Sequence, residues 1–140
     1  MQPAMGDPRF VILHHTQPAA AEHWDLMLQT GDHLATWRLA CLPLTRRRAK
    51  RDRRVATGGL RPQRVKGLPG PDHAALLQAQ RIADHRIEYL SYEGPLSRDR
   101  GHVRRVDEGI YRLLGADDTH WVVAFTGRVL RGTWRLPSAR

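Results

Sequence analysis

The apolar residues of this chain fall into short runs that are separated by turn-forming residues. Candidate strands of this kind occupy residues 9–13, 23–28, 33–39, 86–92, 101–106, 109–114, 120–125 and 129–136. Residues 29–32, with the sequence QTGD, are typical of a hairpin turn between two of these strands. Short strands with turn residues between them predict a mainly β fold, an antiparallel barrel or sandwich.

One segment has the pattern of a helix. Asp72 is a plausible N-cap, and the alanines and leucines that follow it up to residue 83 favour a helix. The sequence therefore predicts one short helix over residues 72–83. A strand over residues 76–82 is the alternative that the pattern leaves open.

The net charge of +9 is concentrated in one place. Of the 23 basic and 14 acidic residues, ten basic residues but only Asp52 lie between Thr45 and Gly67, so the rest of the chain is balanced. Glycines and prolines interrupt residues 45–71, which predicts a long basic loop. Such a charge block binds nucleic-acid backbones without reading sequence, or is a disordered, solubilising insertion without a partner. The residues expected to contact nucleic acid are Arg46, Arg47, Arg48, Lys50, Arg51, Arg53 and Arg54.

Length and composition limit the remaining possibilities. The 140 residues are most simply one domain. Cys41 is the only cysteine, which excludes an internal disulfide and favours a reducing compartment. The N-terminus lacks the pattern of a signal peptide, and no apolar run reaches the length of a membrane span. We therefore expect a cytoplasmic protein that does not associate with membranes.

Three residues near the N-terminus have the chemistry of a metal site. Side chains alternate on a strand, so His23 and Asp25 point to the same face. His15, at the end of a neighbouring antiparallel strand, can supply a third ligand. Two nitrogens and one oxygen suit Mn, Fe, Zn, Ni or Co. In a chain with eight histidines, a chance H-x-D pairing is the competing interpretation.

A second pair of residues has the chemistry of a phosphate site. His85 and Tyr89 are four residues apart and share a face on either a strand or a helix. They can hold a phosphate oxygen or protonate a leaving group. The alternative is a buried tyrosine whose hydroxyl is bonded to a neighbouring histidine.

The order of several blocks resembles a known family. These blocks are RFVILHH, HWDLML, LATWRL, DHRIEYLSYEG, a G-x-V-x-R-x-D-x-G-x-Y stretch and FTGRVLRGTWRL. Together they resemble the 3′-phosphoesterase domain of bacterial ligase D, especially its short stand-alone relatives. The resemblance covers residues 9–136 except the basic segment. It implies a compact antiparallel β-barrel and a manganese-dependent enzyme that removes a 3′-terminal ribonucleotide and a 3′-phosphate from DNA.

The resemblance also implies roles for individual residues. His15, His23 and Asp25 match the metal ligands, and His85 and Tyr89 match the phosphate-side histidine and tyrosine. Mn²⁺ is the expected cofactor, with Zn²⁺ or Co²⁺ as alternatives. The implied partners are DNA 3′ ends, on a primer-template or a duplex, and a separate ligase or polymerase in end joining.

Three positions depart from the family pattern. Met27 and Leu77 stand where the family has arginines that contact phosphate. The spacing between His15 and His23 is two residues longer than usual, so His14 is an alternative ligand. The arginines that could replace the missing ones are Arg38, Arg81, Arg86 and Arg104.

Two other functions compete with the phosphoesterase. A non-catalytic β module with a degenerate site would bind nucleic acid without hydrolysing it. An iron oxygenase would use His23, Asp25 and a distal His85 as a two-histidine, one-carboxylate triad. The short chain and the basic loop argue against the oxygenase.

Overall fold

The computed structural model describes residues 7–42 and 74–140. The predicted DNA-binding residues 46–54 lie outside the described part of the chain. The described residues are mainly β, as the sequence predicted. The strands are β1 (Arg9–Gln17), β2 (Ala20–Thr30), β3 (His33–Leu39), β4 (Ala75–Leu76), β5 (Gln80–Arg86), β6 (Gly94–Pro95), β7 (His102–Ala116), β8 (His120–Thr126) and β9 (Arg131–Pro137).

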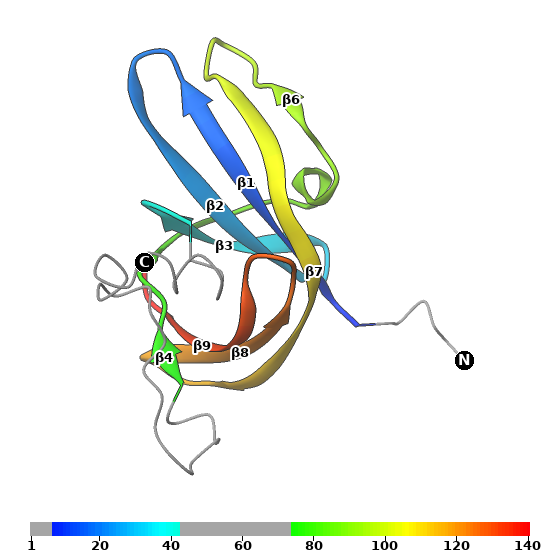
Figure 1. The fold of residues 1–140 in the computed structure, drawn as a ribbon, viewed down its shortest axis with the longest axis vertical. Helices are drawn as coiled ribbons and strands as arrows, with labels where there is room; N and C mark the ends of the chain where they lie inside the picture. Colours follow the sequence, from blue (N-terminus) through cyan, green and yellow to red (C-terminus); the bar gives the residue numbers. More distant parts are fainter. Residues whose placement is uncertain (1–6, 43–73) are drawn as a thin grey trace.

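All nine strands belong to one sheet (Figure 1). Its order is β4-β9-β8-β7-β1-β2-β3-β5, and β6 pairs with β7. The β4–β9 pair is parallel and the other pairs are antiparallel. The long strand β7 runs through both halves of the molecule, alongside β1 and β6 in one half and β8 in the other.

The predicted closed barrel is wrong for the described residues, because no ladder joins β5 to β4 and the sheet remains open. Side chains connect its two ends instead. The guanidinium of Arg81 on β5 lies 4.7 Å from the ring centre of Trp37 and 5.0 Å from that of Trp121. Arg81 also donates from Nη1 to the carbonyl oxygen of Ser138, and Trp37 donates from Nε1 to that of Pro137.

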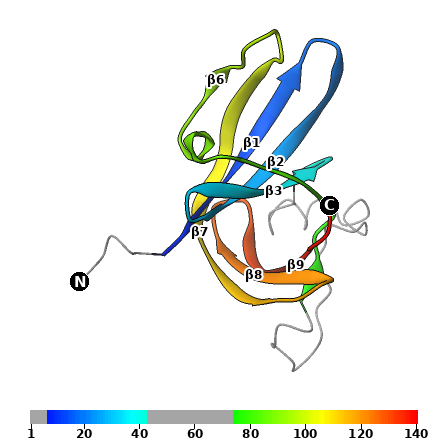
Figure 2. The ribbon, with the colours of Figure 1, turned by 180° about the vertical axis from the view of Figure 1, so that it is seen from behind.

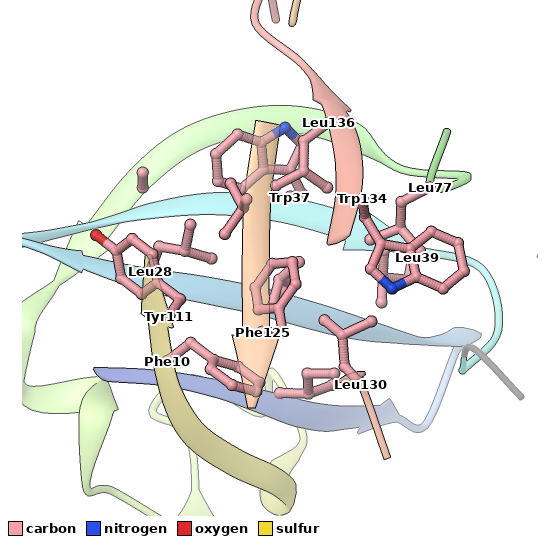
Figure 3. Packing of buried hydrophobic residues seen from close by; sticks show 14 of the residues in the cluster. Phe10, Leu28, Trp37, Leu39, Leu77, Tyr111, Phe125, Leu130, Trp134 and Leu136 are labelled. Atoms are coloured by element: carbon pink, nitrogen blue, oxygen red, sulfur yellow. The ribbon is translucent and has the colours of Figure 1, made fainter. Parts of the chain in front are cut away.

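Strand β1 is buried on both faces, which divides the core into two clusters. Phe10 and Ile12 point into the larger cluster, which fills the curled sheet, and Val11 and Leu13 point into the smaller one. In the larger cluster the rings of Phe10 and Phe125 meet edge to face with centroids 5.0 Å apart (Figure 3). The smaller cluster includes Met27, Leu34, Leu90 and Val103.

The predicted helix over residues 72–83 is wrong for its described part. Ala75 pairs with Trp134 in the parallel β4–β9 ladder, and the backbone N–H of Leu77 donates to the carbonyl oxygen of Arg135. Ala75 and Leu77 are both buried in the larger cluster. Pairing with β9 and burial therefore overrode the helical propensity of this segment.

The predicted strand over residues 86–92 is also wrong, because β5 ends at Arg86 and the 3₁₀ helix η4 (Ile87–Leu90) follows. The turn appears as a small coil below β6 in Figures 1 and 2. Residues three apart coincide on a 3₁₀ helix, and this brings both Ile87 and Leu90 to the smaller cluster. Within residues 7–42 and 74–140, no helix has the length and apolar character needed to cross a membrane.

Candidate metal centre

His15, His23 and Asp25 meet on one face of the β1–β2 hairpin. His15 pairs with His23 across the ladder, and Leu13 pairs with Asp25, so the three side chains share the face of the smaller cluster. One ligand atom from each residue lies within 4.8 Å of the others. His23 and Asp25 are buried and His15 is half-buried. The structure thus groups the three residues that the sequence predicted as metal ligands.

The two histidines are held in a defined orientation. Nε2 of His15 lies 2.8 Å from the carbonyl oxygen of Arg100, and Nδ1 lies 3.1 Å from Nε2 of His23. A carbonyl oxygen only accepts, so Nε2 of His15 carries the proton and Nδ1 presents its lone pair to the cluster. A ligating histidine is commonly fixed in this way through its second nitrogen.

Asp25 supplies a carboxylate oxygen that is not satisfied by hydrogen bonds. Its side chain is 5% exposed, and Oδ1 has no hydrogen-bond partner among the described residues. Two side-chain nitrogens lie beside it, Nε2 of His23 at 3.5 Å and Nε of Arg38 at 3.8 Å. A buried carboxylate oxygen without a hydrogen-bond donor is costly, and a bound cation would reduce that cost. The donors therefore fit Mn²⁺, Zn²⁺ or Co²⁺.

Burial favours the neutral form of His23. Desolvation by burial lowers the pKa of His23, the carboxylate of Asp25 opposes this shift, and electrostatic interactions with Arg38 and His15 add to it. Only a neutral imidazole has a lone pair for a metal. The surroundings of His23 therefore keep it competent as a ligand at lower pH than an exposed histidine.

His14 lies on the opposite face of β1. Its ring stacks on Trp24, with centroids 4.8 Å apart and an interplanar angle of 12°. Its Nε2 atom is 2.7 Å from a carboxylate oxygen of Glu22. Of the two adjacent histidines, the structure therefore places His15 in the cluster and gives His14 other partners.

His85 and Tyr89 lie on the same face as the cluster but apart from it. Their rings are 5.8 Å apart, edge to face, and Nδ1 of His85 lies 3.0 Å from the carbonyl oxygen of Ala83. His85 pairs with Leu34 on β3, four positions from Arg38, which is about 13 Å along the strand. In the described part of the chain, no hydrogen bond joins the pair to the cluster. The triad of His23, Asp25 and His85 is not assembled.

Met27 and Leu77, which replace the expected arginines, are core residues. Met27 is buried in the smaller cluster and Leu77 in the larger one, each 1% exposed. An arginine at either position of this structure would be buried in apolar surroundings, at a large desolvation cost. Both residues therefore contribute packing to the fold.

Arg38 lies beside the cluster, a position that the sequence analysis did not derive. It stands directly opposite Asp25 in the β2–β3 ladder. The signal was present in the hairpin turn at Gly31 and Asp32, because counting back equally from that turn on both strands pairs Asp25 with Arg38. The supporting carbonyl of Arg100 is remote in sequence and had no such signal.

Comparison with known proteins does not assign the chain to a family. No protein-family model matches the chain, and no curated protein matches it. The resemblance to the ligase D phosphoesterase domain stays a prediction.

Proposed function

We propose that the protein is a metal-dependent phosphoesterase that processes DNA 3′ ends in repair or end joining. The observation that carries this proposal is the convergence of His15, His23 and Asp25 around a buried carboxylate oxygen without a hydrogen-bond partner in the described chain. Two imidazoles and one carboxylate are a donor set for Mn²⁺, the cofactor we propose. The ligase D resemblance supplies the substrate class.

His15, His23 and Asp25 would hold the metal ion. A bound Mn²⁺ would polarise the phosphoryl group and lower the pKa of an attacking water. Farther along the same face, His85 and Tyr89 are too distant to contact the same phosphoryl group and would instead donate hydrogen bonds to another phosphate of the bound DNA strand. This assignment requires a substrate long enough to reach both positions, as a DNA strand is.

The substrate would be a DNA 3′ end that carries a phosphate or a single ribonucleotide. The basic residues of the 45–71 segment would bind the DNA backbone and leave the choice of site to the metal centre. The product, a 3′-hydroxyl end, is the form that a separate polymerase or ligase uses.

Activity on a defined end tests this proposal. The protein would be incubated with Mn²⁺ and a primer-template that carries either a 3′-phosphate or one 3′-ribonucleotide. We expect release of phosphate or nucleoside by the wild type, and a loss of about 100-fold or more in His23→Ala and Asp25→Asn. His14→Ala, which changes the adjacent histidine on the other face, is the matched control and should retain activity. If the wild type is as inactive as these variants with every divalent metal tested, the proposed phosphoesterase activity is refuted.

A non-catalytic nucleic-acid-binding module is the second candidate. It is favoured by the separation of His85 and Tyr89 from the metal cluster and by the burial of Met27 and Leu77. DNA binding that survives EDTA, with no release of phosphate in the presence of Mn²⁺, would establish this function in place of the first.

A further inference from the structure

We propose that Arg38 is the anion-binding residue of the candidate metal centre and binds a phosphoryl oxygen of the ligand held there. This inference rests on the proposed function and names a residue for it. Arg38 stands opposite Asp25 in the β2–β3 ladder, and its Nε lies 3.8 Å from Oδ1 of that residue. A positive charge is therefore already present at the edge of the cluster.

The Arg38 side chain is far more accessible than those of Asp25 and His23. It is 47% exposed, against 5% for Asp25 and 11% for His23. Its only ion pair in the described chain is the contact of Nε with Asp25. A guanidinium has five N–H donors in a planar fork. Among residues 7–42 and 74–140, the terminal nitrogens of Arg38 form no ion pair, and they could make a bidentate contact with a phosphate.

Arg81 is excluded from this role by its packing. Its side chain is 13% exposed, and its guanidinium lies between the rings of Trp37 and Trp121. Both tryptophans belong to or pack against the larger core cluster. Arg81 is therefore on the other side of the sheet from the metal ligands.

The strand registers exclude two more arginines. Arg104 pairs with His14, whose side chain points away from the cluster face. Arg86 follows His85 on β5, and since neighbouring side chains alternate it also points away from that face. Of the four arginines that could replace the missing phosphate contacts, Arg38 alone shares the face of the cluster.

Arg105 shares the cluster face but is already paired. It stands opposite Leu13 on β7, and its guanidinium lies 3.7 Å from Glu93 and 3.6 Å from Glu108. Two carboxylates beside one guanidinium repel an anion. Arg38 has one carboxylate neighbour, and that carboxylate is itself a ligand candidate for the cation.

The position of Arg38 predicts effects of opposite sign on two ligands. Arg38 and a bound cation are like charges that share Asp25, so removing the arginine charge strengthens the binding of the cation alone. The same removal weakens the binding of an anion to the loaded site, because a charge-assisted contact is lost. A residue that only supported the fold would weaken both.

The experiment compares Arg38→Met and Arg38→Lys with the wild type in the full chain. Calorimetric titration with MnCl₂ measures cation affinity, and ³¹P line broadening of inorganic phosphate by the Mn²⁺-saturated protein measures anion affinity. For Arg38→Met we expect Mn²⁺ affinity to rise about threefold and phosphate affinity to fall about tenfold or more. Arg38→Lys keeps the charge without the fork and should lie between the two.

Arg112→Met is the matched control, because Arg112 is an exposed arginine in the half of β7 that pairs with β8. It should leave both affinities unchanged. Circular dichroism of each variant confirms that it is folded. Unchanged phosphate affinity in Arg38→Met, or a fall in its Mn²⁺ affinity, overturns the inference about Arg38.

The outcomes also separate this inference from the proposed function. A wild type that binds no Mn²⁺ overturns both. A wild type that binds Mn²⁺, and also binds phosphate through Arg38, supports the anion site. If it then releases no phosphate from a 3′-phosphorylated primer, the proposed enzymatic activity is overturned.

Discussion

His15 and His23 face each other across the β1–β2 ladder, with Nδ1 of one 3.1 Å from Nε2 of the other. The Arg100 carbonyl fixes the proton of His15 on Nε2, so the proton between the two rings belongs to His23. A cation held by these residues would need a lone pair from each histidine, so the proton of a neutral His23 would have to move to its other ring nitrogen, and protonation of either ring would compete with the cation. Binding of the cation should therefore be linked to pH and to the stability of the fold.

Mn²⁺ should stabilise the wild-type protein against unfolding. A ligand that binds only the native state adds about 2.7 kcal/mol to the free energy of unfolding at 100 times its Kd. Asp25→Asn removes the ligand charge while keeping the shape of the side chain, and should abolish this gain. Thermal melting with and without MnCl₂ measures the effect. Equal Mn²⁺-induced shifts in the wild type and in Asp25→Asn would show that the cation binds elsewhere.

Without added metal, the stability should fall as the pH drops through 6.5, the ordinary pKa of histidine. Burial lowers the pKa of His23, so below this pH the unfolded chain takes up a proton that the folded His23 does not. The loss continues until the pH reaches the lowered pKa of the folded state. Urea unfolding between pH 5 and 7.5 should give a shallower slope for His23→Gln than for the wild type. Identical slopes would contradict the prediction.

Two glycines of β7 should respond differently to alanine. A Cβ at Gly109 would lie 2.1 Å from the carbonyl oxygen of Thr126, whereas a Cβ at Gly115 meets nothing within 4 Å. We expect Gly109→Ala to lose about 2 kcal/mol or more of unfolding free energy, and Gly115→Ala to change it by about 0.5 kcal/mol or less. Equilibrium denaturation of both variants measures the difference, and similar losses would argue against the β7–β8 register.

Arg81 should stabilise the fold without affecting the metal centre. Arg81→Met removes the cation–π contacts with Trp37 and Trp121 and the hydrogen bond to Ser138. We expect a loss of about 1–3 kcal/mol of unfolding free energy, with unchanged Mn²⁺ affinity in the folded protein. Arg86→Met, on the same strand, is the control and should cost less. A loss of metal affinity in Arg81→Met would contradict this prediction, because it would show that packing on one face of the sheet affects the metal site on the other.

The basic segment should contribute to DNA affinity alone. Deletion of residues 46–54 removes seven basic residues and Asp52, a net of six positive charges, and each phosphate contact that is lost makes binding less dependent on salt. We expect DNA affinity to fall several-fold at low salt, the salt slope to become shallower, and Mn²⁺ affinity to stay the same. Fluorescence anisotropy with labelled duplex DNA, titrated at several salt concentrations, measures both. A fall in Mn²⁺ affinity would mean that the segment is part of the metal site.

Most of the longer strands and the metal cluster could be predicted from local patterns, whereas the 3₁₀ helix η4 could not. Alternation along β2 places His23 and Asp25 on one face, and the structure confirms this and groups them with His15, the predicted third ligand. The choice between His14 and His15 could not be predicted, because it depends on the irregular register between His15 and Gln17 at the end of the hairpin. That choice is a tertiary property.

The failures of prediction have a common physical cause. Residues 75–77 have helical composition, but β9 offers backbone partners and the larger cluster offers burial. The barrel is not closed, because no ladder joins β5 to β4, and side-chain contacts of Arg81 with Trp37 and Trp121 lie on that side instead. Contacts between residues far apart in sequence decided both outcomes, and no local pattern reports them.

The burial of β1 on both faces has a consequence for the ligand set. Phe10 to Leu13 are all apolar, so a slip of one residue would exchange the two cores without exposing a polar side chain among these four. The same slip would carry His14 to the cluster face and His15 away from it. Hydrophobicity alone therefore leaves two registers of β1 nearly equivalent. The polar contacts of His14 with Glu22 and of His15 with the Arg100 carbonyl favour the observed register. In this hairpin, the contacts that set the register of β1 also determine which histidine becomes the ligand.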